Sequence, residues 1–128
     1  QLHERLRTDA RVTSFEGTDA RALPSLEPMP GIEPFGLVVV DVSFISIRLL
    51  LEAIASRAPV AELLVMVKPQ FEVGRERVGK GGVVRDDALR AQAADDVVAR
   101  AQAIRYIAAW SQSSAGKRDA PAQDGEPT

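Results

Sequence analysis

Cysteine is absent from this sequence of 128 residues, and histidine occurs once, as His3. The lack of cysteine excludes disulfide bonds, thiolate nucleophiles and thiolate metal sites, and one histidine cannot form a histidine metal cluster. Long apolar runs are missing too, because the longest, residues 37–40 and 63–67, fall far short of the about 20 residues of a membrane-spanning helix. No signal segment opens the chain. We therefore expect no metal, no membrane association and a cytoplasmic location.

Charge of one sign is not in large excess, because 16 lysines and arginines stand against 18 acidic residues, a net charge of −2. This balance excludes a protein that binds nucleic acid through a basic surface as a whole, so any basic patch must be local. Aromatic residues are also few: four phenylalanines, one tyrosine and one tryptophan. Valine, isoleucine, leucine and alanine must therefore build the core, and the length allows one such core.

Three segments are predicted strands. Residues 11–15 carry β-branched and aromatic side chains, and residues 37–40 and 63–67 are continuous apolar runs typical of buried parallel strands. Between the first two lies a proline-rich connection, residues 18–36, that cannot hold a long helix. The pattern predicts an α/β fold with about three parallel strands.

A helix that begins at Ser43 or Ser46 and stops before Pro59 is expected to join the last two strands through a right-handed crossover. Asp41 follows the first of these strands, and Lys68 follows the second. Because ligands of parallel sheets bind at the carboxyl ends of the strands, we expect these two side chains to lie together at that edge. Two interpretations stay open, a small charged site facing a crevice and a plain ion pair at the rim of the sheet.

The clearest helix is expected to begin after Asp86, a capping residue, and to continue with helical spacing as far as Ala108. Asp96 and Arg100 should support it as an i,i+4 ion pair. Residues 111–128 have no apolar period and are predicted to form a disordered polar tail.

The loop that follows the last predicted strand is rich in glycine and positive charge. Arg75, Lys80 and Arg85 are its candidate phosphate-binding residues, because backbone N–H groups and cationic side chains together can hold phosphates. A solvated loop without a ligand is the alternative interpretation.

The same loop contains Gly74-x-x-x-x-Gly79-Lys80, which resembles the start of a P-loop and suggests a second interpretation of the loop. Gly81 stands where a serine or threonine would hold magnesium, and no helix is expected to follow at once. A P-loop-like nucleotide-binding protein is therefore the weaker alternative.

Three motifs follow the two apolar strands: Asp41-Val42-Ser43-Phe44-Ile45-Ser46, Val67-Lys68-Pro69-Gln70-Phe71-Glu72-Val73-Gly74-Arg75 and Val78-Gly79-Lys80-Gly81-Gly82-Val83-Val84-Arg85-Asp86. Together they resemble the TlyA family of FtsJ-like ribosomal RNA ribose 2′-O-methyltransferases, historically also called hemolysin A. The resemblance runs from Gln1 to Ala103. It implies a Rossmann-like fold that uses S-adenosylmethionine and acts on ribosomal RNA or a ribosomal subunit. Residues 1–110 would be a partial, incomplete FtsJ-like domain, and full-length members carry an S4-type RNA-binding domain upstream.

The resemblance also implies site residues. FtsJ-like members use a Lys-Asp-Lys-Glu tetrad, and Asp41 and Lys68 match its aspartate and second lysine as catalytic residues. Asp19 and Ala20 match the turn that contacts the adenine of the cofactor, which Asp41 would also approach. For Asp19, a plain Asx-turn is the alternative.

Other parts of the family pattern have no match. The first tetrad lysine and the glycine-rich cofactor loop would lie upstream of Gln1, and the final glutamate is absent. We therefore expect a C-terminal fragment that is inactive alone, with Lys68 protonated and paired with Asp41. A non-catalytic RNA-binding remnant is the alternative function.

Overall fold

Two short parallel strands form the sheet of the described residues, which in this computed structural model are residues 2–104 and 106–112. Strand β1 (Leu37–Val40) pairs with β2 (Glu62–Val65) in a register that sets Val38 opposite Leu63 and Val40 opposite Val65. The ladder continues one step further, because the Met66 N–H donates to the Val40 carbonyl at 2.9 Å. The two apolar runs thus pair as predicted, and β2 ends two residues earlier than expected.

The connection between the strands is helical, as expected. The Ser46 side chain caps η2 (Ile47–Leu49), and α2 (Leu51–Arg57) follows before the chain reaches Pro59. Of the two serines considered, Ser46 is the cap. The apolar side of this connection packs against the sheet, and the core consists of Val40, Ile47, Leu50, Leu51, Ile54, Val97 and Ala101.

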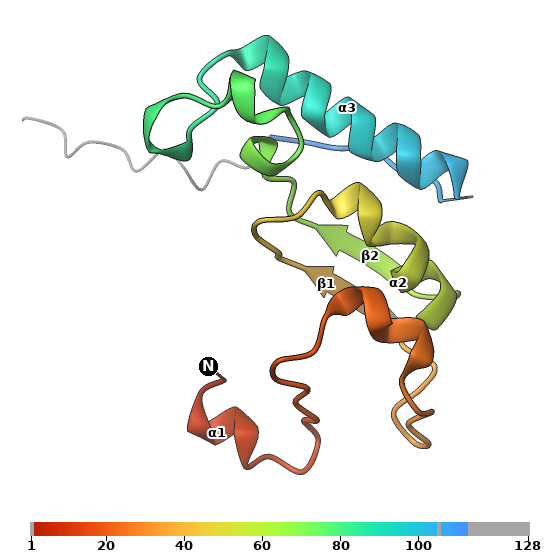
Figure 1. Ribbon diagram of the computed structural model, residues 1–128. Helices are drawn as coiled ribbons and strands as arrows, with labels where there is room; N and C mark the ends of the chain where they lie inside the picture. Colours follow the sequence, from red (N-terminus) through yellow and green to blue (C-terminus); the bar gives the residue numbers. More distant parts are fainter. Residues whose placement is uncertain (1, 105, 113–128) are drawn as a thin grey trace, which may run out of the picture.

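Helix α3 (Asp87–Ala103) supplies the last two of these core residues and packs against η2 and η3 (Pro69–Phe71) (Figure 1). Its start is confirmed, since the Asp86 carboxylate accepts from the N–H groups of Ala88 and Leu89. Its end was predicted too late. The Tyr106 N–H donates to the Ala101 carbonyl at 3.0 Å. The chain turns here and does not continue as a helix, because the turn allows the Tyr106 side chain to pack against the core.

The i,i+4 ion pair expected within α3 does not form. Asp96 accepts from the Gln92 side chain at 2.8 Å, whereas Arg100 reaches across to Glu52 of α2 at 3.3 Å. Arg100 therefore pairs with an acidic residue of another helix and not with Asp96 of its own helix. Beyond the helix, residues 106–112 have no regular structure, and the rest of the predicted disordered tail, residues 113–128, lies outside the described residues.

The predicted strand at residues 11–15 is wrong, because this segment is a turn followed by irregular chain. Asp9 holds the segment locally, accepting from the Arg11 backbone N–H at 2.8 Å and from its guanidinium at 2.7 Å. A strand needs a neighbouring edge for its backbone groups, and the described residues place none beside this segment. The sheet consequently has two strands here and not three.

The long connection before β1 holds a short helix, η1 (Ala20–Ser25), and is fastened to α2 by Arg57. The Arg57 Nε lies 2.6 Å from Glu33 Oε1, and its guanidinium also donates to the carbonyls of Leu26 and Glu27. This anchor holds the chain after η1 against the end of α2, while the first residues of η1 face the loop after β1. The chain begins with α1 (Glu4–Arg7), which is set apart from the sheet (Figure 1).

One face of the sheet is apolar and open. Alternate side chains of the strands, Leu37, Val39, Leu64 and Met66, are each more than half exposed. Parallel sheets are normally covered on both faces, whereas α2 covers only the opposite face here. No helix among the described residues has the length and apolar character needed to cross a membrane.

Candidate functional site

Asp41 and Lys68 meet at the carboxyl edge of the sheet, as the sequence predicts. The Lys68 ammonium lies 2.6 Å from Asp41 Oδ1 and donates to the Ser43 hydroxyl at 2.9 Å. The Lys68 side chain is 22 % exposed and that of Asp41 is 61 % exposed. An ion pair this open to water contributes little to folding stability. The Lys68 ammonium is a positively charged hydrogen-bond donor near the surface, at the carboxyl ends of two strands.

The loop after β1 presents an aromatic ring to solvent. Phe44 has a φ of 66°, in the left-handed region, and is 91 % exposed. Its nearest aromatic neighbour is Phe71 of the loop after β2, with ring centroids 5.2 Å apart. A bulky residue in this conformation costs about 1 to 3 kcal/mol and persists only where the surroundings impose it. The loop is therefore held in an unfavourable shape that displays an aromatic ring next to Ser43, the residue that Lys68 contacts.

A hollow of about 570 Å³ lies between η1 and the loop after β1. It brings the predicted cofactor residues Asp19 and Ala20 together with Ser43 and Phe44. Asp41 does not line it and stands two residues before Ser43. The complete lining consists of Thr18, Asp19, Ala20, Arg21, Val42, Ser43, Phe44, Ile45, Leu49 and Leu50.

Asp19 is a strongly acidic carboxyl group in this hollow. Its carboxylate accepts from the Arg21 guanidinium at 2.6 Å and from the Arg21 backbone N–H at 2.8 Å. The guanidinium contact is the main reason that the pKa of Asp19 falls to about 2. The backbone contact is the Asx-turn that the sequence left open, and it caps η1. Ala20 is the first residue of η1, so its N–H has no acceptor within the helix.

The glycine-rich loop after β2 places its cations in solvent. Arg75 lies in η4 (Arg75–Arg77) and Lys80 in η5 (Lys80–Gly82), while Arg85 follows just before the cap of α3; all three are exposed. In the described part of the chain, none of the three has an ion-pair partner. They are therefore available to an anionic ligand.

Glu72 is a buried charge that sequence reasoning missed. Its side chain is 2 % exposed, and its carboxylate accepts from the Ser46 hydroxyl at 2.5 Å, the Ile47 N–H at 2.7 Å and Arg48 Nε at 3.1 Å. The residue belongs to one of the motifs noted in the sequence. Its neighbours in the chain nevertheless give no sign that its partners lie 24 to 26 residues away.

Comparison with known proteins identifies the family. The model of the FtsJ-like methyltransferase family matches residues 1–117. The chain belongs to the FtsJ-like methyltransferases. It is 46 % identical over 109 residues to the 16S/23S rRNA (cytidine-2′-O)-methyltransferase TlyA of Mycobacterium tuberculosis, covering 83 % of this chain and 39 % of the relative.

A second relative of this FtsJ-like chain is YqxC of Bacillus subtilis, named as a candidate rRNA methyltransferase, with 39 % identity over 84 % of the chain and 38 % of the relative. Among solved structures, a candidate hemolysin from Streptococcus thermophilus superposes with a TM-score of 0.64 at 37 % identity, over 79 % of this chain and 36 % of that one. The resemblance to the TlyA family is thereby confirmed. The chain spans about two fifths of the length of these relatives.

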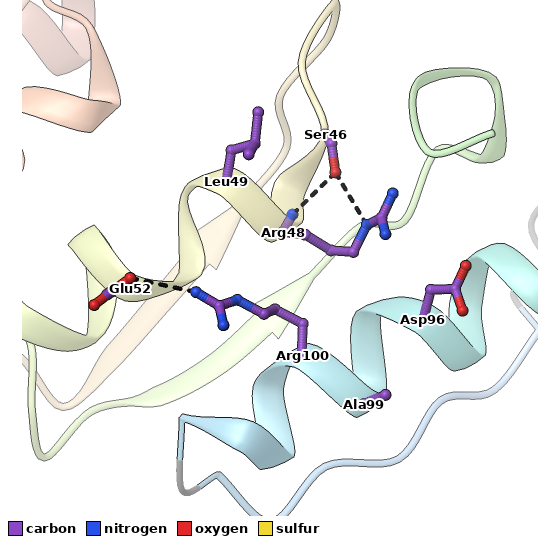
Figure 2. A pocket seen from close by; sticks show the side chains of 7 residues that line it. All are labelled: Ser46, Arg48, Leu49, Glu52, Asp96, Ala99 and Arg100. Carbon is purple, nitrogen blue, oxygen red and sulfur yellow. Dashed lines mark hydrogen bonds and ion pairs between the residues drawn. The ribbon is translucent and has the colours of Figure 1, made fainter. Parts of the chain in front are cut away.

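A second hollow of the FtsJ-like chain, about 850 Å³, lies between the crossover connection and α3 (Figure 2). It contains none of the residues predicted for the site. Both of its arginines already have acidic partners, Arg48 with Glu72 and Arg100 with Glu52. We assign it no ligand. Its lining consists of Ser46, Arg48, Leu49, Glu52, Asp96, Ala99 and Arg100.

Proposed function

We propose that this chain is part of an S-adenosylmethionine-dependent ribose 2′-O-methyltransferase that acts on ribosomal RNA. The observation that carries the proposal is the contact between Lys68 and Asp41, 2.6 Å apart at the carboxyl edge of the sheet, in a chain of the FtsJ-like family. The names of the relatives, rRNA methyltransferases in both cases, support the choice of substrate. Such a substrate would be met in the cytoplasm.

The hollow beside η1 fits one end of the proposed cofactor. An adenine ring presents one amino donor and several ring-nitrogen acceptors, and the Asp19 carboxylate and the Ala20 N–H offer the complementary acceptor and donor. The apolar side chains of Val42, Ile45 and Leu50 line the same hollow and suit the faces of a flat ring. S-adenosylmethionine, when bound, supplies a methyl group that an oxygen nucleophile can attack.

Lys68 is the proposed catalytic residue toward the RNA. A ribose 2′-hydroxyl is a weak nucleophile until its oxygen is oriented and its developing negative charge is stabilised. The Lys68 ammonium, held between Asp41 and Ser43, can donate to that oxygen and stabilise its negative charge, while the hydroxyl proton would pass to water as the methyl group leaves the cofactor sulfur. We assign Asp41 the role of orienting the Lys68 ammonium toward that oxygen.

The RNA itself would be bound by the exposed parts of the two loops. Arg75, Lys80 and Arg85 are the proposed phosphate contacts, because they are exposed cations in the loop that follows β2 and Lys68. Each phosphate neutralised adds to the salt dependence of binding. The exposed ring of Phe44 offers a stacking surface for a base, which is the usual way proteins hold unpaired RNA nucleotides.

We also propose that the remaining part of the parent protein completes the site. The relatives are more than twice as long as the matched segment, and the open apolar face of the sheet is a surface that further elements could cover. A further cofactor-binding half and an S4-type RNA-binding domain are the expected additions. The 128-residue chain alone is expected to be inactive.

The test is a chimeric enzyme in which this chain replaces the matched 109 residues of the M. tuberculosis TlyA relative. Methyl transfer from labelled S-adenosylmethionine to ribosomal RNA is measured. We expect Lys68→Ala to lower kcat by roughly 10²- to 10³-fold, the usual effect of removing one donor to a developing oxyanion, with little change in KM.

Lys80→Ala is the matched lysine control, and it should raise KM for RNA with kcat nearly unchanged. Equal kcat values for the chimera and its Lys68→Ala variant would refute the catalytic role of Lys68. A chimera that binds RNA but transfers no methyl group would favour the RNA-binding remnant.

A further inference from the structure

The loops that follow β1 and β2 are joined at three successive levels. Nearest the sheet, the Met66 N–H donates to the Val40 carbonyl at 2.9 Å. Next, Lys68 contacts Asp41 and Ser43. Furthest along both loops, the Glu72 carboxylate contacts Ser46 and Ile47. Along each loop, Asp41 and Lys68 therefore stand between the contact at the sheet and the contact made by Glu72.

The Glu72 contacts are the most enclosed of the three levels. One carboxylate oxygen accepts from the Ser46 hydroxyl at 2.5 Å and from Arg48 Nε at 3.1 Å, and the other accepts from the Ile47 N–H at 2.7 Å. Arg48 donates in addition to the backbone carbonyl of Glu72 at 3.1 Å. Figure 2 shows Ser46 and Arg48 bonded to each other at this point. A carboxylate with this set of donors is satisfied and directionally fixed.

The loop after β1 needs such a restraint. Phe44 holds a left-handed φ of 66° although 91 % of its surface is exposed, so burial of its own side chain cannot be what imposes the conformation. Glu72 binds Ser46 and Ile47, two and three residues further along. The sheet fixes the loop at Val40, and Glu72 fixes its other end.

The loop after β2 is fixed by the same residue. The Phe71 N–H donates to the Lys68 carbonyl at 2.9 Å, and the Glu72 N–H donates to the Pro69 carbonyl at 3.0 Å. These bonds make residues 68–72 one compact turn, with Lys68 at its start and Glu72 at its end. A movement of Glu72 would therefore move the backbone from which Lys68 extends.

We infer that Glu72 is a positioning residue, which ties the two loops together and thereby holds the Lys68 ammonium against Asp41 and Ser43. The functional half of this inference rests on the proposed role of Lys68 in methyl transfer. Glu72 itself does not touch the reacting atoms. It acts by fixing the distance between the two loops that carry Asp41 and Lys68.

The first test uses the 128-residue chain and does not depend on activity. Lysine is labelled with ¹⁵N, and the ammonium signals are recorded by NMR at low temperature, where hydrogen-bonded ammonium groups exchange slowly with water. The sequence has three lysines, Lys68, Lys80 and Lys117, so a Lys68→Arg spectrum assigns the signal. We expect the Lys68 signal in the unaltered chain, and its loss in Glu72→Gln and in Ser46→Ala.

Glu52→Gln is the matched control, because Glu52 is 78 % exposed and, among the described residues, pairs with Arg100 and not with the two loops. It should keep the Lys68 signal. Circular dichroism establishes that each variant retains its helices, and Ser46→Ala, which removes only one of the carboxylate's donors, is the variant to use if Glu72→Gln does not fold. Retention of the Lys68 signal in a folded Glu72→Gln or Ser46→Ala chain would overturn the inference.

The second test uses the chimeric enzyme and separates the two proposals. Glu72→Ala should lower kcat by about 10²-fold, the effect expected for a misplacement of about 1 Å, and KM for RNA should stay within twofold. The kcat of Glu72→Gln should lie between that of the unaltered chimera and that of Glu72→Ala. If the unaltered chimera is inactive, the methyltransferase proposal fails and the NMR result still decides the positioning role. If the chimera is active and Glu72→Ala keeps the full kcat, the positioning role in catalysis is refuted.

Discussion

Asp19 remains charged at a lower pH than an ordinary aspartate, because the Arg21 guanidinium lowers its pKa from 3.8 to about 2. A carboxyl group with a lowered pKa in the folded state stabilises that state above the unfolded pKa, and the contribution disappears as the pH falls through the folded pKa. The stabilisation by Asp19 is therefore complete at neutral pH and is lost between pH 3.8 and about 2.

We predict that an NMR titration of the Asp19 carboxyl carbon has its midpoint at about pH 2, and that Arg21→Ala moves the midpoint back toward 3.8. Arg11→Ala is the control, because the side-chain hydrogen bond of Arg11 is the main cause of the lowered pKa of Asp9 and does not involve Asp19. A midpoint near 4 in the unaltered chain would contradict the contact between Asp19 and Arg21.

Phe44 combines an unfavourable backbone conformation with an exposed ring. We predict that Phe44→Gly leaves the free energy of unfolding unchanged or raises it by up to about 1 kcal/mol, because glycine adopts a positive φ without strain and this gain outweighs its entropic cost. The same change should weaken RNA binding by the chimeric enzyme by about 1 to 3 kcal/mol, the value of one stacked base.

Leu49→Gly provides the comparison for stability. Leu49 is also largely exposed but has a right-handed helical backbone in η2, so the glycine there should cost about 1 kcal/mol. Urea unfolding followed by circular dichroism measures both variants. A loss of more than 1 kcal/mol in Phe44→Gly would mean that the Phe44 side chain itself stabilises the loop.

At the scale of single elements, α3 is the part of the fold that is most locally determined. The Asp86 carboxylate satisfies the N–H groups of Ala88 and Leu89 at 2.8 and 3.4 Å. We predict that Asp86→Ala lowers the free energy of unfolding by about 1 kcal/mol, the usual value of an N-cap. Asp87→Ala should lower the free energy of unfolding by less, because the contacts of Asp87 in the described part of the chain are those with the helix dipole and with Arg90. Thermal denaturation compares the two variants. Equal losses in the two variants would contradict the capping role of Asp86.

The elements differ in how well the sequence predicts them, and the reason is the range of the interactions. Residues 37–40 and the start of α3 were predicted because apolar runs and capping side chains act within a few residues. The strand expected at residues 11–15 was wrong, because a strand depends on a neighbouring edge that its own residues do not specify. The end of α3 was missed because Tyr106 packs on a core built by other elements.

At the scale of the whole molecule, the described residues contribute only part of the proposed cofactor site. Residues 18–21, 42–45 and 49–50 line the hollow beside Asp19, whereas ligands of this size are usually enclosed over most of their surface. We predict that calorimetric titration of S-adenosylmethionine into the isolated chain shows no binding in the micromolar range. The chimeric enzyme should bind the cofactor under the same conditions, and micromolar binding by the isolated chain would refute the view that the site is incomplete.

The sequence by itself determined the family, the parallel pairing of the two apolar runs and the meeting of Asp41 with Lys68. These follow from motif order and from the rule that parallel strands present their carboxyl ends at one edge. Only the tertiary structure decided that Glu72 is buried between the two loops, that Phe44 is exposed with a positive φ, and that Asp19 lies beside Ser43. Each of these depends on contacts between residues more than 20 positions apart, which no local pattern of residues specifies.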